Sequence, residues 1–439
     1  MSAKKSYDKV FTLLREHSEF FNKSLPLIAS ENITSPAVRE ALTSDFGHRY
    51  AEGWPGERVY AGCKYIDQVE LLAMELAKEI FRAEYVDVRP VSGVSANLIM
   101  YTAFTEPGDR IMALSIPTGG HISSGKKRLW GTAGAVHGLK VDYFDYDDGS
   151  LNIDVDKSVK TIRRMERRGD HINLYLFGAS VFPFPHPVRE FTELAAEYNA
   201  KIAYDAAHVA GLIGAGLFQD PLREGADCVQ TSTHKTFFGP QRGMVISWEK
   251  YAETLRNAAF PANLSNHHLH TLAAFAVALC EFKEFGRAYS GQVIKNAKAL
   301  GQALHERGFK VLGEREGFTK SHVLLIDVLN TPMKNGYRVE TEFEKAGIVV
   351  NRNLLPYDIR EGRHFMEPGG IRIGTSEITR LGMKESEMIE VADLMKRVII
   401  DGEDPEKIAG DIAEFRKSYQ RCYYCFDEAA QAYKYMKFS

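Results

Sequence analysis

The sequence predicts an α/β fold in which a mostly parallel sheet is covered by helices on both faces. From about residue 81, short apolar runs alternate with helical patterns, which is typical of parallel strands joined by crossover helices. Hydrophobic residues make up 44% of the chain and charged residues 26%. This composition is ordinary for a globular enzyme and excludes a disordered or fibrous protein. The longest purely apolar run, residues 272–280, has nine residues, whereas a membrane-spanning helix needs about 20.

The expected elements follow in order along the chain. The first 80 residues are predicted to form helices interrupted by a polar, glycine-rich stretch at 50–57. We then expect the seven strands of the main sheet at 85–90, 110–115, 141–145, 172–177, 201–205, 227–232 and 243–248.

A change of pattern near residue 278 predicts a second, smaller α+β unit. Its expected helices span 279–288 and 293–307, and its expected strands lie at 323–328, 347–351 and 371–374. The predicted domains are therefore an N-terminal helical segment (1–80), a large α/β domain (81–278) and a small C-terminal α+β domain (279–439).

The charge balance and the cysteines of the chain exclude some classes of protein. The chain has 55 lysine and arginine residues and 58 aspartate and glutamate residues, so its net charge is −3. This balance argues against a general binder of nucleic acid or of anionic membranes. The charged N-terminus lacks the apolar core of a signal peptide, so we expect a cytoplasmic protein. Cys422 and Cys425 form a C-x-x-C without a second ligand pair, which favours local core or surface thiols and no bound metal.

Three sets of unusual residues follow predicted strands, where parallel sheets bind ligands. Asp205, with His208 three residues later, can face a basic ring nitrogen or can simply cap a helix. Lys235, in the segment 231–240, suits a Schiff base if it is buried, although most lysines are solvated. The Ser-Gly turn within 91–97 can cradle a phosphate or can merely begin a helix.

Together the three sets supply an acid, an amine and an anion cradle at one edge of a sheet. This is the inventory that binds pyridoxal 5′-phosphate: the lysine attaches the cofactor, the acid keeps the pyridine nitrogen protonated and the turn holds the phosphate. No P-loop, GxGxxG or H-E-x-x-H motif competes with this interpretation.

Seven ordered motifs resemble those of the serine hydroxymethyltransferases, and above all the archaeal type. They lie at residues 27–32, 48–53, 58–65, 119–121, 204–211, 232–236 and 370–375. The resemblance implies the aspartate-aminotransferase-like fold (PLP fold type I), pyridoxal 5′-phosphate as cofactor and a homodimer with shared active sites. It also implies reversible interconversion of L-serine and glycine, with the one-carbon unit passed to a reduced pterin.

The resemblance assigns cofactor roles to matching residues. Lys235 would carry the cofactor, with His234 beside it affecting reaction specificity. Asp205 would pair with the pyridine nitrogen, and His121 would stack on the ring. The other cofactor residues would be Ser92, Gly93 and Val94 at the phosphate, with Ser180, His208 and Ser232 around the ring.

The resemblance also assigns substrate roles. Arg372 would bind the substrate carboxylate, for which its planar fork is well shaped, and Ser30 would assist. Glu52 would be the acid–base group at the substrate hydroxyl. Tyr50 and Tyr60 would reach the site from the partner subunit, and the pterin side would include Gly120, Ile122 and Asn353. Taken singly, each histidine or tyrosine is equally explained by packing.

The match departs from bacterial and eukaryotic relatives at three places. Residues 260–268 replace a glycine-rich loop that reaches the neighbour's phosphate, and we expect the amides of Ser265 or Asn266, or a nearby histidine, to take that role. Val59 replaces a tyrosine near the pterin, which leaves tetrahydrofolate and a tetrahydromethanopterin-type carrier both open. The dipeptide Gln241-Arg242 stands where relatives often have Arg-Gly. A role for Arg242 at the protein surface is as consistent with this difference as a role at the cofactor.

Two other functions use the same residues. The first is a pterin-independent aldolase or transaldolase acting on β-hydroxy amino acids such as threonine. Retention of Glu52 and Asn353 favours transfer to a pterin over this alternative. The second is a non-catalytic relative, which the complete set of Lys235, Asp205, Arg372 and Glu52 disfavours.

Overall fold

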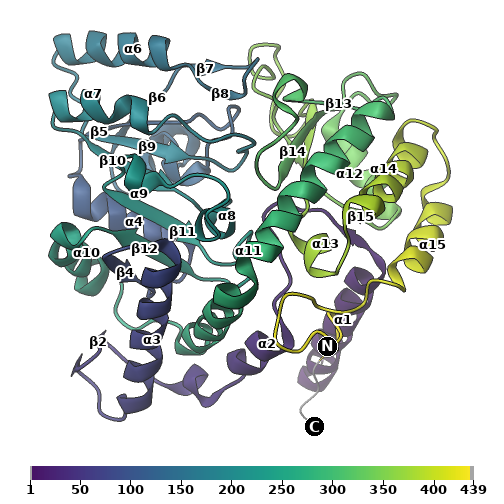
Figure 1. Cartoon of the computed structure of the whole chain (residues 1–439), viewed down its shortest axis with the longest axis horizontal. Helices are drawn as coiled ribbons and strands as arrows, with labels where there is room; N and C mark the ends of the chain where they lie inside the picture. Colours follow the sequence, from purple (N-terminus) through teal and green to yellow (C-terminus); the bar gives the residue numbers. More distant parts are fainter. Residues whose placement is uncertain (1, 436–439) are drawn as a thin grey trace.

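The computed structural model describes residues 2–435, and its largest element is a seven-stranded, mostly parallel sheet (Figure 1). The strand order is β4-β12-β11-β10-β9-β5-β6, and only β12 runs antiparallel to its neighbours. All seven predicted strands are confirmed, with ends shifted by a few residues. They are β4 (Tyr85–Asp87), β5 (Arg110–Ala113), β6 (Lys140–Tyr143), β9 (Leu174–Gly178), β10 (Lys201–Asp205), β11 (Cys228–Ser232) and β12 (Gly243–Ser247).

Helices bury both faces of this sheet. On β9, Tyr175 and Phe177 belong to one apolar cluster, whereas Leu174 and Leu176 belong to another. Successive side chains of a strand point to opposite faces, so both faces are covered and the strand is apolar throughout. The flanking helices are α3 (Lys64–Phe81), α4 (Gly93–Phe104), α5 (Thr132–Ala135), α6 (Val155–Arg167), α7 (Thr192–Glu197), α8 (Ala210–Gly214), α9 (Pro221–Glu224) and α10 (Ala252–Asn257).

A second sheet of four antiparallel strands lies in the C-terminal part of the chain, in the order β13-β14-β17-β16. Its strands are β13 (Lys310–Val311), β14 (Val323–Asp327), β16 (Asn351–Asn353) and β17 (Gly370–Gly374). The helices of this region are α12 (Gly336–Lys345), α13 (Ser376–Arg380), α14 (Glu385–Ile399) and α15 (Pro405–Arg416).

The single strand predicted at 347–351 is wrong, because the chain changes sheets within it. β15 (Ile348–Val349) pairs in parallel with β1 (Leu25–Pro26), whereas β16 pairs with β17. One apolar run therefore serves two sheets, a switch that periodicity alone does not reveal.

The predicted break between two helices at 289–292 is also wrong. A single helix, α11 (Leu269–Glu306), crosses the molecule (Figure 1). Tyr289 and Ser290 are buried and donate hydrogen bonds to the carbonyls of Ser376 (3.2 Å) and Gly211 (3.1 Å). This packing outweighs the weak helix propensity of Ser290-Gly291. The predicted domain boundary at 278/279 falls inside α11, which contributes side chains to the cores of both sheets.

The N-terminal segment contains α1 (Ala3–Lys23), α2 (Pro36–Leu42) and a short hairpin of β2 (Gly53–Trp54) and β3 (Glu57–Arg58). The remaining hairpin joins β7 (Tyr146–Asp147) and β8 (Asn152–Ile153). Cys422 and Cys425 are buried free thiols that pack with Ile33 and Leu381. Within residues 2–435, no helix combines the length and the apolar character that crossing a bilayer requires.

Candidate active site

The carboxyl ends of β9, β10 and β11 meet the N-terminus of α4 around a cavity of about 250 Å³. This is the edge at which parallel sheets bind ligands. The cavity is lined by Ser92, Gly93, Val94, Asn97, His121, Ala179, Ser180, Asp205, Ala207, His208, Ser232, His234, Lys235 and Gln241. The structure thus brings together the nine residues to which the resemblance assigns cofactor contacts within one protomer, namely Ser92, Gly93, Val94, His121, Ser180, Asp205, His208, Ser232 and Lys235.

The first turn of α4 forms an anion cradle. The Ser92 hydroxyl accepts a hydrogen bond from the Ser95 amide at 3.1 Å, and the Ser95 hydroxyl accepts one from the Ser92 amide at 2.9 Å. This reciprocal cap leaves the amides of Gly93 and Val94 without a partner among residues 2–435. Free amides at a helix N-terminus favour a phosphate, both by hydrogen bonding and through the helix dipole.

Asp205, at the end of β10, is fixed by two donors. Its Oδ1 accepts from the Ala207 amide at 3.0 Å, and its Oδ2 accepts from Asn97 Nδ2 at 2.9 Å. The same Nδ2 donates to Ser123 Oγ at 2.9 Å. Ser123 in turn contacts His121 Nδ1 through both its hydroxyl and its amide. Because an amide only donates, His121 Nδ1 is an acceptor and the ring proton lies on Nε2.

Glycines let the backbone close around this edge. Gly178 has φ +94° next to Asp205, and a Cβ there would lie 2.0 Å from the Asp205 carbonyl oxygen. A Cβ on Gly120 would lie 2.1 Å from the Leu114 carbonyl oxygen. Neither position accommodates a side chain without displacing backbone.

Lys235 follows β11 in a loop held by backbone contacts. Its carbonyl accepts a hydrogen bond of 2.6 Å from Asn32 Nδ2, whereas its Nζ has no hydrogen-bond partner among the described residues. Burial, together with the nearby Arg372 guanidinium, lowers the pKa of Lys235 to about 8, even though the Asp205 carboxylate acts in the opposite direction. A buried amine with a lowered pKa suits covalent attachment of a carbonyl compound.

Two histidines flank the lysine loop. Burial and the Lys235 ammonium lower the pKa of His234 to about 4. His208 is fully enclosed, and its Nδ1 lies 3.4 Å from Nε2 of His322. His322 Nε2 also donates to the Ala29 carbonyl at 3.0 Å, so His208 Nδ1 accepts. Burial holds the pKa of both His208 and His322 well below the ordinary value, and both rings are neutral.

Arg372, on β17, is a buried guanidinium without a carboxylate. It donates to the carbonyl of Ser180 (3.0 Å), to Asn351 Oδ1 (3.1 Å) and to Ser30 Oγ (3.4 Å). No carboxylate within residues 2–435 forms an ion pair with it, and burial lowers its pKa to about 10. A buried charge is normally paired, so a carboxylate from a ligand is the missing partner.

These donors fit the cofactor predicted from the sequence. The free amides can bind a phosphate, the fixed carboxylate can pair with a protonated ring nitrogen, and the unpartnered buried amine can hold the aldehyde carbon. The site of Arg372, contiguous through Ser180, fits an amino-acid carboxylate.

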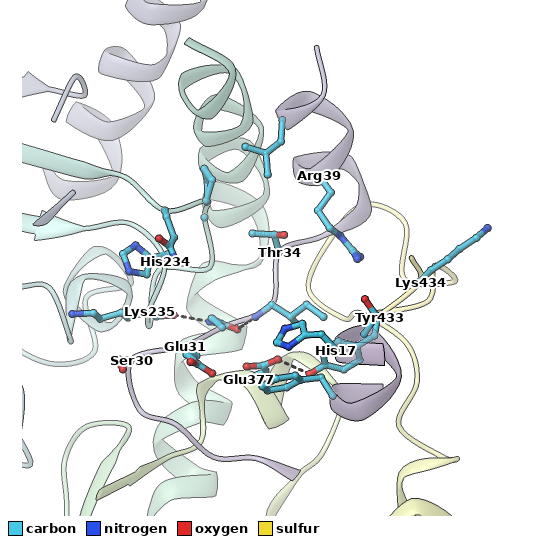
Figure 2. Close-up of a pocket in the computed structure, with 18 residues that line it drawn as sticks. His17, Ser30, Glu31, Thr34, Arg39, His234, Lys235, Glu377, Tyr433 and Lys434 are labelled. Carbon is cyan, nitrogen blue, oxygen red and sulfur yellow. Dashed lines mark hydrogen bonds between the residues drawn. The ribbon is translucent and has the colours of Figure 1, made fainter. Parts of the chain in front are cut away.

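The other side of Lys235 faces a larger cavity of about 650 Å³ (Figure 2). Figure 2 shows His234, Lys235 and Ser30 at one end and Tyr433 hydrogen-bonded to Glu377 at the other, with Glu31 between the two ends. Burial raises the pKa of Glu377 to about 7. The wall opposite the lysine therefore comes from α1, α13 and the C-terminal segment.

A third cavity of about 330 Å³ adjoins Arg372 and contains the predicted pterin-side residues Gly120, Ile122 and Asn353. It shares His121 and Ser180 with the cofactor cavity. Its outer wall includes Arg352, which pairs with Glu340 and lies near the rings of Tyr337 and Phe365.

Glu52, Tyr50 and Tyr60 line none of these three cavities. The two tyrosine rings are 4.7 Å apart, and each residue is 45% exposed. Val59 is more exposed still. Within one protomer, the predicted acid–base group is therefore separate from the predicted amine.

The surface role considered for Arg242 is wrong, because its side chain is completely buried. It donates to the carbonyls of Val88 and His268 and to Nδ1 of His267. Its guanidinium lines none of the three cavities, so its contacts are with neighbouring segments of the chain.

Four supporting residues were missed by the sequence interpretation: Asn97, Ser123, His322 and Asn351. Asn97 lies one helical turn after Gly93, and that spacing is a signal that it shares the cavity. Asn351 is two residues before Asn353 on the same strand. Nothing in the sequence near His322 indicates that it meets His208.

Comparison with known proteins agrees with this geometry. A family model described as serine hydroxymethyltransferase matches residues 3–395. The serine hydroxymethyltransferase of Nitrosopumilus maritimus is 54% identical over 99% of this chain and 98% of its own length. That of Korarchaeum cryptofilum is 54% identical over 99% and 100%, and that of Methanocaldococcus jannaschii is 52% identical over 97% and 96%. With this agreement across nearly its whole length, the chain belongs to the serine hydroxymethyltransferase family.

Proposed function

We propose that this chain interconverts L-serine and glycine, passing the one-carbon unit to and from a reduced pterin, with the cavity around Lys235 as its active site. Its family is named for this reaction and depends on pyridoxal 5′-phosphate. The observation that carries the proposal is the meeting of three groups. The buried amine of Lys235 and the fixed carboxylate of Asp205 line one cavity, and the unpaired guanidinium of Arg372 adjoins it.

The residues of the cavity divide the work of holding the cofactor. The amides of Gly93 and Val94 would bind the phosphate, Asp205 would hold a proton on the ring nitrogen, His121 would cover a ring face and Lys235 would provide the point of attachment. When bound, the cofactor supplies an electron-accepting ring that stabilises negative charge at the α-carbon of the amino acid.

Arg372 binds the amino-acid carboxylate through a fork that already has its remaining donors satisfied by Ser180, Asn351 and Ser30. Fixing the carboxylate restricts rotation of the substrate within the cavity. Orientation of this kind can remove several kcal/mol from a reaction barrier.

Glu52 is the group that takes and returns the proton of the substrate hydroxyl. It acts in the site of the partner protomer, because in its own protomer it lies outside every cavity that contains Lys235. The exposed Tyr50 and Tyr60 reach the partner's site by the same route. This arrangement agrees with the family's dimeric state.

The segment 260–268 is a further candidate for a contact with the partner. Asn266 and His267 are engaged within their own chain, by the Ala51 amide and by Arg242. The contact of Asn266 uses only its side chain, so the amides of Ser265 and Asn266 and the exposed His268 remain the candidates for the partner's phosphate.

We retain the two-domain division of the chain as a proposal. The large α/β domain (81–278) and the small α+β domain (279–439) each have a sheet and an apolar core of their own. The aspartate-aminotransferase-like arrangement of these domains is part of the same proposal.

The test is glycine formation from L-serine by the holoenzyme, with and without each reduced pterin. We expect the rate to rise with tetrahydrofolate or with a tetrahydromethanopterin-type carrier, because the cavity of Gly120, Ile122 and Asn353 adjoins the carboxylate site. Equal rates with and without both pterins would reject hydroxymethyl transfer and favour an aldolase. The relative rates with the two pterins identify the carrier.

A further inference from the structure

The main chain on both sides of Glu52 is held by buried charged side chains. Arg58 Nη1 donates to the Ala51 carbonyl at 2.8 Å and also to the Gly53 carbonyl. Arg89 Nη1 donates to the same Gly53 carbonyl at 2.9 Å. The Ala51 amide donates to Asn266 Oδ1 at 3.0 Å. Backbone groups of the residues on both sides of Glu52 are therefore held, and the carbonyl of Glu52 itself accepts from the Val59 amide at 3.1 Å.

Arg58 itself has no freedom to move. Its Nε lies 2.8 Å from Asp67 and its Nη2 lies 2.6 Å from Glu70. The Arg58 side chain is only 4% exposed, and Glu70 is fully buried. Burial would raise the pKa of Glu70, but contacts with His267 and Arg58 outweigh it and hold that pKa at about 2. The pair is therefore ionised, and four of the five N–H groups of Arg58 donate hydrogen bonds to described residues.

The ion pair extends into a network that joins distant segments. His267 Nε2 lies 3.3 Å from Glu70, and its Nδ1 accepts from Arg242 Nη2 at 2.7 Å. Through Arg242 the network continues to the carbonyls of Val88 and His268. It thus connects the hairpin β2–β3 with α3, the end of β4 and the start of α11.

A buried network of this kind is a poor way to gain stability. Apolar residues of similar volume often stabilise a fold as well or better, because burying ions carries a large desolvation penalty. What hydrogen-bonded ions do provide is a unique geometry. The group most affected by that geometry is Glu52, since its own side chain makes no hydrogen bond within residues 2–435 and is set only by its backbone.

We propose that Arg58 is a positioning residue for Glu52: its fork, anchored on Glu70 and Asp67, fixes the carbonyls on either side of Glu52 and so aims the carboxylate at the reacting group. The inference rests on the proposed function, in which Glu52 is the acid–base group. It assigns a role to a residue that touches neither cofactor nor substrate in its own protomer.

The test is Arg58→Lys in the holoenzyme, with Arg256→Lys as the matched control. Lysine keeps the charge but cannot hold two carbonyls and two carboxylates at once. We expect kcat for pterin-dependent serine cleavage to fall about 100-fold, as for a displacement near 1 Å of a reacting group. The KM for serine and the affinity for the cofactor should stay within about twofold. Arg256 packs on Trp54 of the same hairpin and pairs with Glu57, but it does not contact residues 51–53, so its variant should keep wild-type kcat.

A double-mutant cycle separates positioning from general loss of structure. If Arg58 acts through Glu52, Arg58→Lys lowers kcat in the wild-type background but has no further effect in the Glu52→Gln background. If Arg58→Lys lowers kcat by the same factor in the wild-type and Glu52→Gln backgrounds, the inference is overturned. It is also overturned if the single variant Arg58→Lys keeps the wild-type kcat. Wild-type protein without pterin-dependent activity rejects the proposed function and the inference with it, so the two failures are distinguishable.

Asn266→Ala provides a milder variant if Arg58→Lys does not fold. It removes only the acceptor of the Ala51 amide, so we expect kcat to fall about fivefold to tenfold, again without a further loss in the Glu52→Gln background. If Asn266→Ala leaves kcat unchanged, or if its effect on kcat adds to that of Glu52→Gln, the geometry around Glu52 is not what limits the reaction.

Discussion

The side-chain amide of Asn97 donates a hydrogen bond of 2.9 Å to Oδ2 of Asp205, and its second hydrogen is directed to Ser123 Oγ at 2.9 Å. The Ser123 hydroxyl in turn contacts His121 Nδ1 at 2.8 Å. One amide on the first turns of α4 thus holds both the acid proposed for the ring nitrogen and the imidazole proposed for the ring face.

Asn97→Ala should weaken cofactor binding by about 10-fold to 100-fold, because it leaves an acceptor of Asp205 unsatisfied, a loss of about 1–3 kcal/mol. Equilibrium dialysis of the coenzyme, with the visible absorbance of the holoenzyme, measures this. Asn296→Ala is the matched control, since the buried Asn296 also donates two hydrogen bonds, to Thr379 and to Met383, away from the cavity. Equal affinities in wild type and Asn97→Ala would contradict the role.

Attachment of the cofactor should depend on pH through Lys235. With its pKa lowered to about 8 by burial, the amine is neutral above that pH and protonated below it. The rate of attachment to the apoprotein should therefore rise with a midpoint near pH 8, well below that of an ordinary lysine. Stopped-flow absorbance measures the rate.

Lys235→Ala should remove the covalent link while leaving the fold intact. Borohydride reduction followed by mass spectrometry should then find no cofactor adduct, whereas Lys283→Ala, which alters an exposed lysine paired with Glu79, should behave as wild type. An adduct in Lys235→Ala would show that another amine holds the cofactor.

Arg372→Ala should lower the affinity for serine by more than about 100-fold, since truncating one partner of a buried charge pair costs about 2–5 kcal/mol. Arg372→Lys should recover only part of it, because an ammonium cannot replace the fork that also reaches Ser180 and Asn351. Spectroscopic titration with serine or glycine gives the affinity. Unchanged binding in Arg372→Ala would place the carboxylate elsewhere.

Glu377 should make the protein less stable as the pH rises. Its folded-state pKa, raised by burial to about 7 from an ordinary 4.5, means that the folded state binds more protons between these values. The contribution of Glu377 to stability is therefore greatest below its ordinary pKa. It is lost as the pH rises through the folded-state pKa, and the total loss is about 3 kcal/mol.

Glu377→Gln should remove this pH dependence. The stability of the variant relative to wild type should therefore increase between about pH 5 and about pH 8. Thermal denaturation at both pH values checks the difference, with the exposed Glu406→Gln as control. A constant difference between wild type and Glu377→Gln would mean that Glu377 ionises normally.

The main sheet could be predicted from the sequence because each strand is buried on both faces and reads as an apolar run, as in Leu174–Gly178 and Cys228–Ser232. The position of the cofactor cavity could be predicted from the same strands, because residues directly after parallel strands gather at one edge of the sheet. Asp205 and Lys235 needed only this rule.

Other features depend on tertiary contacts that no local pattern records. Ser290-Gly291 resembles a helix end until Tyr289 and Ser290 are seen bonded to Ser376 and Gly211. The buried state of Arg242 depends on His267 and on the carbonyl of Val88, which lies 154 residues away. The role proposed for Glu52 depends on a second protomer, which a single sequence does not position.

The uninterrupted course of α11 limits how the molecule can select its ligands. A helix of 38 residues, about 57 Å long, is embedded in the cores of both sheets. The amine on the larger sheet and the guanidinium on the smaller one therefore keep a constant separation unless the helix bends. A β-amino acid, whose carboxylate lies one carbon further from its nitrogen, should consequently fit this spacing less well than serine or glycine.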